Sequence, residues 1–396
     1  MRPTYLEVDL NQLKQNLENI RAHVASAKVM PMVKANAYGH GVEGVAPFIE
    51  PYVDYFGVAL VEEAIQLREL GITKPILVAG GTLVEQLLLF IQHDLTLTAS
   101  SMELLTAAEQ LAESARKQLK VHLKIDTGME RVGVHEYEAE EFIQKSIAYR
   151  HLDVEGVYTH LANSEAWSLR GEADPKQSTA ELGFASTEAL PLAMTSAALQ
   201  LERFQEVLHF YEKNSLPMPI RHVCNSGGVL NLPEAHFDMV RPGILFYGVY
   251  PGRDIEKKID VQPALTWKSK VAYSKVTLPR RAVSYGSLWQ AEARTRIVTI
   301  PCGYADGYFR RMTNRAQVII NGKSYPQVGR ICMDQFMVNV GDDDVKVGDE
   351  VILFGGGITA EDLADWAGTN EYEVMTNISA RVPRVFVQRE MPSSIA

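Results

Sequence analysis

The sequence predicts a parallel (β/α)8 barrel that is followed by a second, mostly β domain. Up to Gly248, eight short runs of β-branched and apolar residues alternate with longer helical patterns, as in repeated strand–helix units. Beyond Gly248 this alternation stops, and strand-like runs are separated by Gly, Pro and Asn-Gly turns. The length of 396 residues also exceeds what one core usually supports, so two domains are expected.

The eight predicted barrel strands are short runs that lie between polar segments. They cover residues 28–35, 55–60, 75–80, 95–100, 120–126, 153–160, 222–227 and 239–248. Between the second and third runs, the segment 60–70 places Leu60, Ala64, Leu67 and Leu70 on one helical face. An open doubly wound sheet would instead be expected to carry a GxGxxG turn after its first strand, and the turn found there does not match.

Two further segments complete the predicted barrel. Residues 101–117 form a helical pattern with Ser101 at the position of an N-cap. Residues 161–221, between the sixth and seventh strands, are far more than one crossover helix needs. We expect a polar loop there, followed by a long helix. This insert lies on the face where barrel active sites form, so it either shapes the entrance or decorates the surface, and we favour the first.

Composition restricts the class of protein. An apolar content of 46% and a charged content of 22% are typical of a soluble globular protein. The first residues lack the apolar stretch of a signal peptide, and no run approaches a bilayer span. Cys224, Cys302 and Cys332 cannot all pair, and no CxxC motif indicates a metal site, so we expect a cytoplasmic protein without metal. The net charge of −10 argues against nucleic-acid and membrane partners, although a local basic pocket remains possible.

Polar side chains gather at the carboxyl ends of the predicted strands, which open into one mouth in a barrel. They are Lys34, Lys124, Asp126, Arg131, His160, Asn225, Ser226 and Arg241. Any one of them could be a solvated strand end, but a cluster from several strands favours a site. Small residues at 226–228 and 242–244 offer backbone N–H groups for a phosphate. A lysine that can form an imine, together with a phosphate cradle, suggests pyridoxal phosphate.

The motif "VKANAYGHG" at 33–41 resembles the cofactor-lysine motif of the alanine racemase family. Further family motifs follow in order: "KIDTGMERVG", "VYTHLAN", "HVCNSGG", "DMVRPGILFYG", "VSYG", "PCGYADGYFRR", "VGRICMDQFMV" and "EYEV…SARVPR". The resemblance implies a barrel at 10–248, a β domain made of 1–9 and 249–396, and a head-to-tail homodimer. It also implies interconversion of L-alanine and D-alanine on pyridoxal phosphate, which supplies D-alanine for peptidoglycan.

The same resemblance assigns catalytic and cofactor-binding roles. Lys34 is the imine lysine and the base on one face of the substrate, and Tyr285 of the partner subunit is the base on the other. His160 lies beside Tyr285 and beside Arg241, and Arg241 faces the pyridine nitrogen of the cofactor. Because arginine only donates hydrogen bonds, it leaves that nitrogen unprotonated and favours racemisation over transamination. The residues expected at the phosphate are Tyr38, Ser226, Gly243, Ile244 and Tyr372.

Further roles concern the substrate and the entrance. Arg131 is expected at the cofactor's phenolic oxygen and at the substrate carboxylate. Carbamylation of Lys124 would give Arg131 an anionic neighbour, whereas two bare cations would repel. The substrate and entrance residues expected from the β domain of the partner are Met333, Asp334, Tyr304 and Arg310. For Tyr304, Arg310 and Asp334, packing between subunits is the alternative role.

Three departures from the family pattern lie near the predicted mouth. Glu130 stands where the family usually has glycine and is next to Arg131, whose pairing it could alter. The stretch "THLANSE" at 159–165 lacks the usual phenylalanine, and the connection 161–221 is longer than usual. These departures bear on substrate range, so a broad-specificity racemase of serine or basic amino acids is the alternative function. A barrel-type decarboxylase is disfavoured by Arg241, and a cofactor-homeostasis barrel is disfavoured by the β domain.

Overall fold

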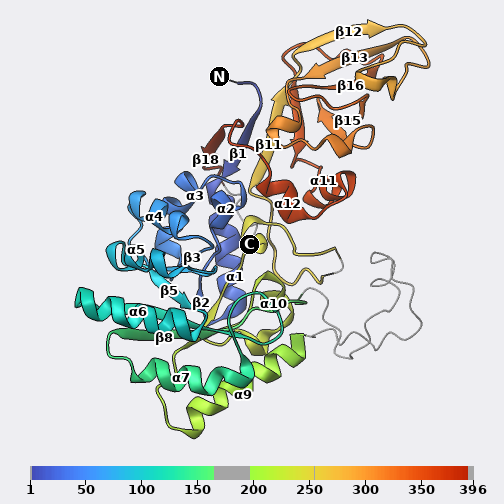
Figure 1. The fold of residues 1–396 in the computed structure, drawn as a ribbon. Helices are drawn as coiled ribbons and strands as arrows, with labels where there is room; N and C mark the ends of the chain where they lie inside the picture. The colour runs from blue at the N-terminus through green and yellow to red at the C-terminus, as the bar shows by residue number, and fades with distance from the viewer. Residues whose placement is uncertain (1, 165–196, 254, 391–396) are drawn as a thin grey trace.

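Parallel strands and helices alternate along the first part of the chain in the computed structural model, which describes residues 2–164, 197–253 and 255–390 (Figure 1). The barrel strands are β2 (Lys28–Val29), β3 (Phe56–Val58), β4 (Ile76–Val78), β5 (Thr96–Ala99), β6 (Leu119–Asp126), β8 (Leu152–Tyr158), β9 (Ile220–His222) and β10 (Met239–Val240). From β3 to β9 these strands pair in parallel in this order, β10 pairs with β2, and a parallel bridge joins Met32 to Gly57 of β3. The N–H of Arg241 donates to the carbonyl of Cys224 over 2.9 Å, beyond the ends of β9 and β10. The predicted (β/α)8 barrel is confirmed.

The first and the last two barrel strands are shorter than predicted. The run 28–35 is strand only at Lys28–Val29, and Met32 makes an isolated bridge before the chain turns at Lys34. The run 222–227 is strand only at its start, because the chain then turns into the short helix α10 (Ser226–Asn231). The run 239–248 is strand only as far as Val240. Pro242 lacks the N–H that a strand ladder needs, and the 3₁₀-helix η5 (Ile244–Tyr247) follows. These early ends leave polar groups of the chain at the barrel mouth.

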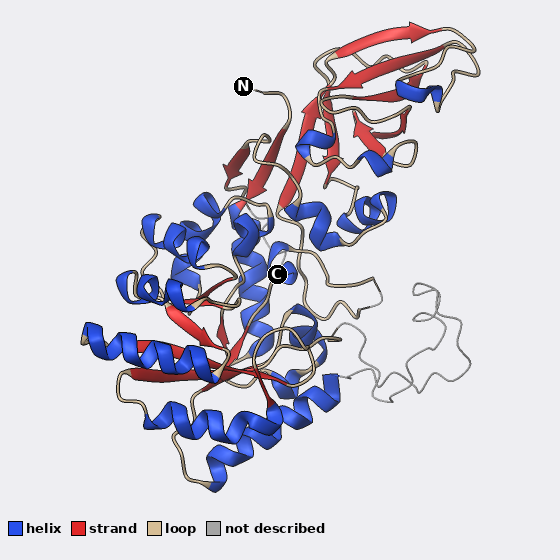
Figure 2. Ribbon diagram, in the orientation of Figure 1, coloured by secondary structure: helices blue, strands red, loops and turns tan. Residues whose placement is uncertain are grey.

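Helices cover the outside of the barrel (Figure 2). They are α1 (Leu10–Val24), α3 (Val42–Ile49), α4 (Val61–Glu69), α5 (Leu87–Gln92), α6 (Met102–Ala115), α7 (Ala139–Ala148) and α9 (Ala197–Lys213). α6 begins after Ser101, whose hydroxyl accepts from the N–H of Leu104 over 3.1 Å, as predicted. α4 buries Ala64 and Leu67, but the expectation for Leu60 is wrong: this residue precedes the helix and is exposed. α9 is the predicted long helix of the 161–221 connection, and the predicted loop before it falls on 165–196, outside the described residues.

A nine-stranded sheet forms the second part of the molecule, drawn mainly in orange and red in Figure 1. In sheet order its strands are β12 (Tyr273–Thr277), β13 (Thr295–Ile300), β16 (Phe336–Gly341), β15 (Lys323–Val328), β14 (Gln317–Ile320), β17 (Glu350–Phe354), β11 (Leu265–Lys270), β1 (Tyr5–Asp9) and β18 (Arg384–Val387). The start of the chain therefore belongs to this sheet, since β1 pairs with β11 and β18. The Asn321-Gly322 turn joins β14 to β15 as predicted, with positive φ at both residues. The domain limits of 10–248 and 249–396 stay predictions.

The chain leaves the barrel at a tight turn beside α1. The side chain of Asn16, buried in α1, donates to the carbonyls of Phe246 and Gln262 over 3.1 and 2.9 Å. Gly248 has φ +86°, and a Cβ there would lie 1.8 Å from the carbonyl oxygen of Gln262. The backbone at Gly248 is therefore in close contact with the backbone at Gln262. Among the described residues, no helix is both long and apolar enough to span a bilayer.

Replacing Gly248 by alanine should test how tightly this turn is packed. Gly71 also has φ +86°, but a Cβ there would meet no atom within 4 Å, so Gly71→Ala is the matched control. We expect Gly71→Ala to lower the free energy of unfolding by about 1–2 kcal/mol, the cost of the left-handed conformation. Gly248→Ala should cost a further 1–3 kcal/mol or so because the added methyl collides with backbone. Urea unfolding measures both, and equal costs would contradict the close contact.

Candidate active site

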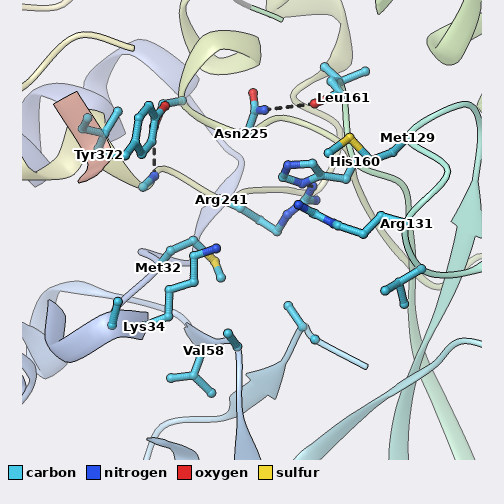
Figure 3. A pocket seen from close by; sticks show the side chains of 18 of the residues that line it. Met32, Lys34, Val58, Met129, Arg131, His160, Leu161, Asn225, Arg241 and Tyr372 are labelled. Carbon is cyan, nitrogen blue, oxygen red and sulfur yellow. Dashed lines mark hydrogen bonds between the residues drawn. The ribbon is translucent and has the colours of Figure 1, made fainter. Parts of the chain in front are cut away.

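A cavity of about 630 Å³ opens at the carboxyl ends of the barrel strands (Figure 3). It collects the following predicted site residues: Lys34, Tyr38, Lys124, Arg131, His160, Asn225, Ser226, Arg241, Gly243, Ile244 and Tyr372. Tyr372 comes from α12 (Glu371–Thr376), so the C-terminal part of the chain contributes to the wall. The charged residues that line the cavity are Lys34, Lys124, Arg131 and Arg241, and none of the described lining residues is a carboxylate. The cavity is therefore a local basic pocket in an acidic protein, suited to an anionic ligand.

Lys34 begins a single left-handed turn, labelled α2 (Lys34–Tyr38), and extends into the cavity (Figure 3). The four residues after it have φ between +50° and +54°, a conformation that costs about 1–2 kcal/mol for each residue with a side chain. Two side chains hold the turn. Glu63 accepts from the N–H of Ala35 over 2.7 Å, and Asn36 accepts from the N–H of Val42 over 2.8 Å. Burial and the nearby Arg131 lower the pKa of Lys34, which increases its neutral fraction.

Hydroxyl groups and a glycine form one end of the cavity. The hydroxyl of Ser226 accepts from the N–H of Gly243 over 2.9 Å. A Cβ at Gly243 would lie 2.6 Å from the hydroxyl oxygen of Tyr38, so only glycine leaves this space open. Tyr38 stacks on Tyr247, and burial raises the pKa of the Tyr38 phenol, which stays a neutral donor. This end can donate hydrogen bonds to a small anion such as a phosphate.

Lys124 lies deeper in the barrel. Its Nζ donates to the carbonyl of Ile125 over 2.9 Å and lies 5.3 Å from the ring centroid of Tyr158. Burial is the main reason that the pKa of Lys124 falls to about 7. A large fraction of this amine is therefore neutral at neutral pH, which is the form that reacts with carbon dioxide.

The loop that carries Arg131 is shaped by Asp126, which does not line the cavity. Its Oδ1 accepts from the N–H groups of Gly128 and Met129 over 2.9 and 2.8 Å, and its Oδ2 accepts from that of Arg131 over 3.1 Å. Burial would raise the pKa of Asp126, but these N–H donors outweigh it and hold the pKa below its usual value. Asp126 is thus a structural member of the predicted cluster.

Glu130 does not disturb this loop in the way its position suggested. It has φ +52°, which explains why glycine suits the site, and its Oε2 lies 3.2 Å from Nε2 of His135. Arg131 makes no ion pair with any residue that the structure describes. The carboxylate of Glu130 therefore pairs with His135 at the surface and not with Arg131.

Arg241 is surrounded by hydrogen-bond acceptors. Its Nη2 donates to the carbonyls of Thr159 and Val223 over 2.8 and 2.9 Å and lies 3.4 Å from Nδ1 of His160. Burial, and then the positive charge of Arg241, hold the pKa of His160 well below its usual value, so the imidazole is neutral. The predicted contact between Arg241 and His160 is present.

Sequence reasoning missed two histidines, His222 and His122. Nδ1 of His222 accepts a hydrogen bond from Nη1 of Arg241 over 2.9 Å, and Nε2 of His222 lies 2.8 Å from Nδ1 of His122. A signal was available: His122 and Lys124 are two residues apart in one strand and must point to the same side.

Apart from Tyr372, the predicted residues of the β domain lie outside this cavity. They are Tyr285, Tyr304, Arg310, Met333 and Asp334. Tyr285 is 70% exposed and lines a second cavity of about 670 Å³ between β12 and Cys332. Tyr304 and Met333 are also exposed, and they lie on adjacent segments because the N–H of Ala305 donates to the carbonyl of Met333. Within one chain, these residues do not complete the site.

Comparison with known proteins gives a consistent result over the whole chain. Residues 8–251 match the family model "Alanine racemase, N-terminal domain", and residues 264–386 match "Alanine racemase, C-terminal domain". The chain is 41% identical to the alanine racemase of Carboxydothermus hydrogenoformans, covering 98% of this chain and 100% of the relative. Its fold is similar to the alanine racemase of Clostridium difficile 630, with TM-score 0.87, 36% identity and coverage of 98% and 96%. The enzyme from Streptomyces lavendulae gives TM-score 0.87 at 32% identity, with 98% of each chain covered.

Replacing Asp126 and Glu130, the two carboxylates of the Arg131 loop, one at a time should separate their roles. Glu130→Gly relieves a positive φ and removes only an exposed contact, so we expect the free energy of unfolding to change by less than about 1 kcal/mol. Asp126→Asn turns one acceptor oxygen into an N–H that faces the N–H of Arg131, which should cost about 1–3 kcal/mol. Urea unfolding and limited proteolysis of residues 127–133 measure the difference. A larger effect for Glu130→Gly would reverse the assignment.

Proposed function

Because the chain belongs to the alanine racemase family, we propose that it interconverts L-alanine and D-alanine with pyridoxal phosphate as its cofactor. The observation that carries the proposal is the cavity in which a half-buried lysine of lowered pKa shares its space with three further cations and no described carboxylate. Such a cavity fits a ligand that brings both a phosphate and a carboxylate. A pyridoxal phosphate decarboxylase would be expected to offer a carboxylate where Arg241 lies.

The residues present fit this cofactor. Ser226, Tyr38 and the open space at Gly243 would hold its phosphate, with Ile244 and Tyr372 beside them. Arg241 would face the pyridine nitrogen, and since it can only donate, it would keep that nitrogen unprotonated. When bound, the cofactor withdraws electrons from Cα of the amino acid and so makes the α-proton removable. A ring without the extra proton withdraws less strongly, which favours return of the proton to Cα.

Two bases on opposite faces of Cα would carry out the racemisation. Lys34 would take or give the proton on one face, helped by the lowered pKa of its amine. On the other face we place the partner subunit's Tyr285, because Tyr285 is exposed on its own chain and does not line the cavity of that chain. His160 is neutral, and because its Nδ1 accepts from Arg241, its proton is on Nε2, from which it would donate a hydrogen bond to the oxygen of that phenol. The functional unit is then a head-to-tail homodimer.

The remaining predicted residues would bind the substrate carboxylate and shape the entrance. Arg131 would pair with the carboxylate, and a carbamate on Lys124 would supply the anion that holds Arg131 in place. Met333 and Asp334 of the partner, with Tyr304 and Arg310, would close the opposite side. We also place the enzyme in the cytoplasm, where it would supply D-alanine for peptidoglycan. The insert that suggested a broader substrate range falls largely on 165–196, outside the described residues.

Mixing two inactive variants should test the shared site. Lys34→Ala should lose activity and the visible absorbance band of bound pyridoxal phosphate, and Tyr285→Phe should lose activity but keep the band. After subunit exchange, we expect roughly a quarter of wild-type activity, because half of randomly formed dimers are hybrids with one intact site of two. Each variant exchanged with itself is the control. No recovery after proven exchange would mean that each chain builds its own site.

Substrate preference should follow the size of the residues around Cα. Tyr372 lies on the cavity wall, and the proposal adds the partner's Tyr304 and Met333, which leaves room for little more than a methyl group. We expect kcat/KM to be highest for L-alanine, with L-serine next, and to fall about 10- to 200-fold for L-lysine and L-arginine because of overpacking. Enantiomer-resolved assays of the four amino acids under one condition measure this. A basic amino acid that exceeds alanine would indicate the broad-specificity alternative.

A further inference from the structure

A row of polar side chains leads from Arg241 into the closed interior of the barrel. Nη1 of Arg241 lies 2.9 Å from Nδ1 of His222, and Nε2 of His222 lies 2.8 Å from Nδ1 of His122. Nε2 of His122 then lies 3.5 Å from Oε2 of Glu155 in β8. Both imidazoles are fully buried, whereas the carboxylate side chain is partly exposed. Tyr55 lies beside Glu155 at the far end, where burial and then the nearby carboxylate raise the pKa of its phenol.

The protons of this row can be arranged in only one direction. Arginine has no acceptor, so Nδ1 of His222 must accept and its proton must be on Nε2. That proton is donated to Nδ1 of His122, which places the proton of His122 on Nε2, facing Glu155. At 3.5 Å the last contact is longer than a typical hydrogen bond, so it is an electrostatic contact between N–H and carboxylate. Each group thus donates toward the negative charge at the end.

This row compensates a charge that has no direct partner. Arg241 is 3% exposed, and within the described part of the chain it makes no ion pair with a carboxylate. A buried cation without compensation is costly. Burial would raise the pKa of Glu155, but its contacts with His122 and Tyr55 outweigh burial and hold the pKa below its usual value. Glu155 is therefore ionised at neutral pH and supplies the missing negative charge at a distance.

The local sequence leaves space for the row and fixes its rings. A Cβ at Gly156 would lie 2.5 Å from Nδ1 of His122, so a side chain there would displace the imidazole. The pairing of β6 with β8 shifts register between Val121 and His122, at the same place. The ring of Tyr158 stacks on His222 with centroids 4.5 Å apart and planes at 8°. The two rings are thus held by packing as well as by hydrogen bonds.

We infer that Glu155, His122 and His222 are positioning residues for Arg241, which they keep charged and aimed at the cofactor ring. The inference rests on the proposed function in one respect: the ring nitrogen of the cofactor is taken as the acceptor of a remaining N–H of Arg241. The row acts through Arg241 and touches neither cofactor nor substrate. Its loss should therefore change the chemistry at the ring more than the binding of alanine.

Histidine NMR of the ¹⁵N-labelled protein tests the row without any need for activity. We expect His122 and His222 to be neutral with the proton on Nε2, and each signal is assigned by its loss in His122→Gln or His222→Gln. Glu155→Gln keeps an acceptor but removes the charge, so the Nε2–H signal of His122 should move upfield, and that of His222 less. Asp153→Asn removes an exposed carboxylate of the same strand, whose charge acts on His122 more weakly than that of Glu155; it is the matched control and should move both signals less than Glu155→Gln does. A proton on Nδ1 of His222 would overturn the inference.

Kinetics of the loaded enzyme give a second, separate readout. Glu155→Gln should lower kcat for alanine about 10-fold with less than a two-fold change in KM, Glu155→Asp should recover part of it, and Asp153→Asn should behave as wild type. Equal kcat for Glu155→Gln and Asp153→Asn would overturn the inference. If Glu155→Gln does not fold, Tyr55→Phe removes the phenol that helps to hold the pKa of the same carboxylate low, and it should shift the His122 signal in the same direction. An unchanged signal would count against the row. A wild type that forms the row but does not racemise alanine would refute the proposed function alone.

Discussion

A guanidinium ion cut off from water organises the interior of this barrel. Arg241 can only donate hydrogen bonds, so every group around it has to accept. Two backbone carbonyls and two imidazole nitrogens do so, and this requirement keeps His160 and His222 neutral with Nδ1 unprotonated. The same direction of donation continues from His222 through His122 to Glu155. Gly156 leaves space for the ring of His122, and Tyr158 stacks on the ring of His222. A feature of one side chain therefore determines residue types on several strands.

Backbone strain is concentrated beside Lys34, another cation of the cavity. The turn after Lys34 has four consecutive residues with positive φ, none of them glycine. Its cost is offset by the hydrogen bonds that Glu63 and Asn36 accept from backbone N–H groups, and by the burial of Ala37 and Tyr38. The same turn brings Lys34 and Tyr38 to one cavity, where the proposal makes Lys34 the reacting amine and Tyr38 a hydrogen-bond donor to the phosphate. An ordinary right-handed turn would project the two side chains differently, so the strain is tied to the geometry of the site.

The sequence predicted what depends on periodicity and chain order, and missed what depends on contacts between distant residues. The eight strand–helix units and the Asn321-Gly322 hairpin follow from local patterns, and the cavity residues follow from their position at strand ends. The positive φ values at Ala35 and Ala37 could not be predicted, because alanine rarely adopts them and the compensating Glu63 is distant in sequence. The pairing of Glu130 with His135 also required the loop geometry that Asp126 imposes. His122 was within reach of simple strand alternation.

The excess of cations in the cavity couples ligand binding to basicity. Burial and the neighbouring positive charges lower the pKa values of Lys34 and His160, and burial lowers that of Lys124. An anion that enters removes part of this repulsion and raises the affinity of Lys34 for a proton. Lys34 is therefore a weaker base while the site awaits a ligand, and would become a stronger base once a phosphate and a carboxylate are in place. The same charges that attract an anionic ligand thus delay full basicity until that ligand is positioned to lose its proton.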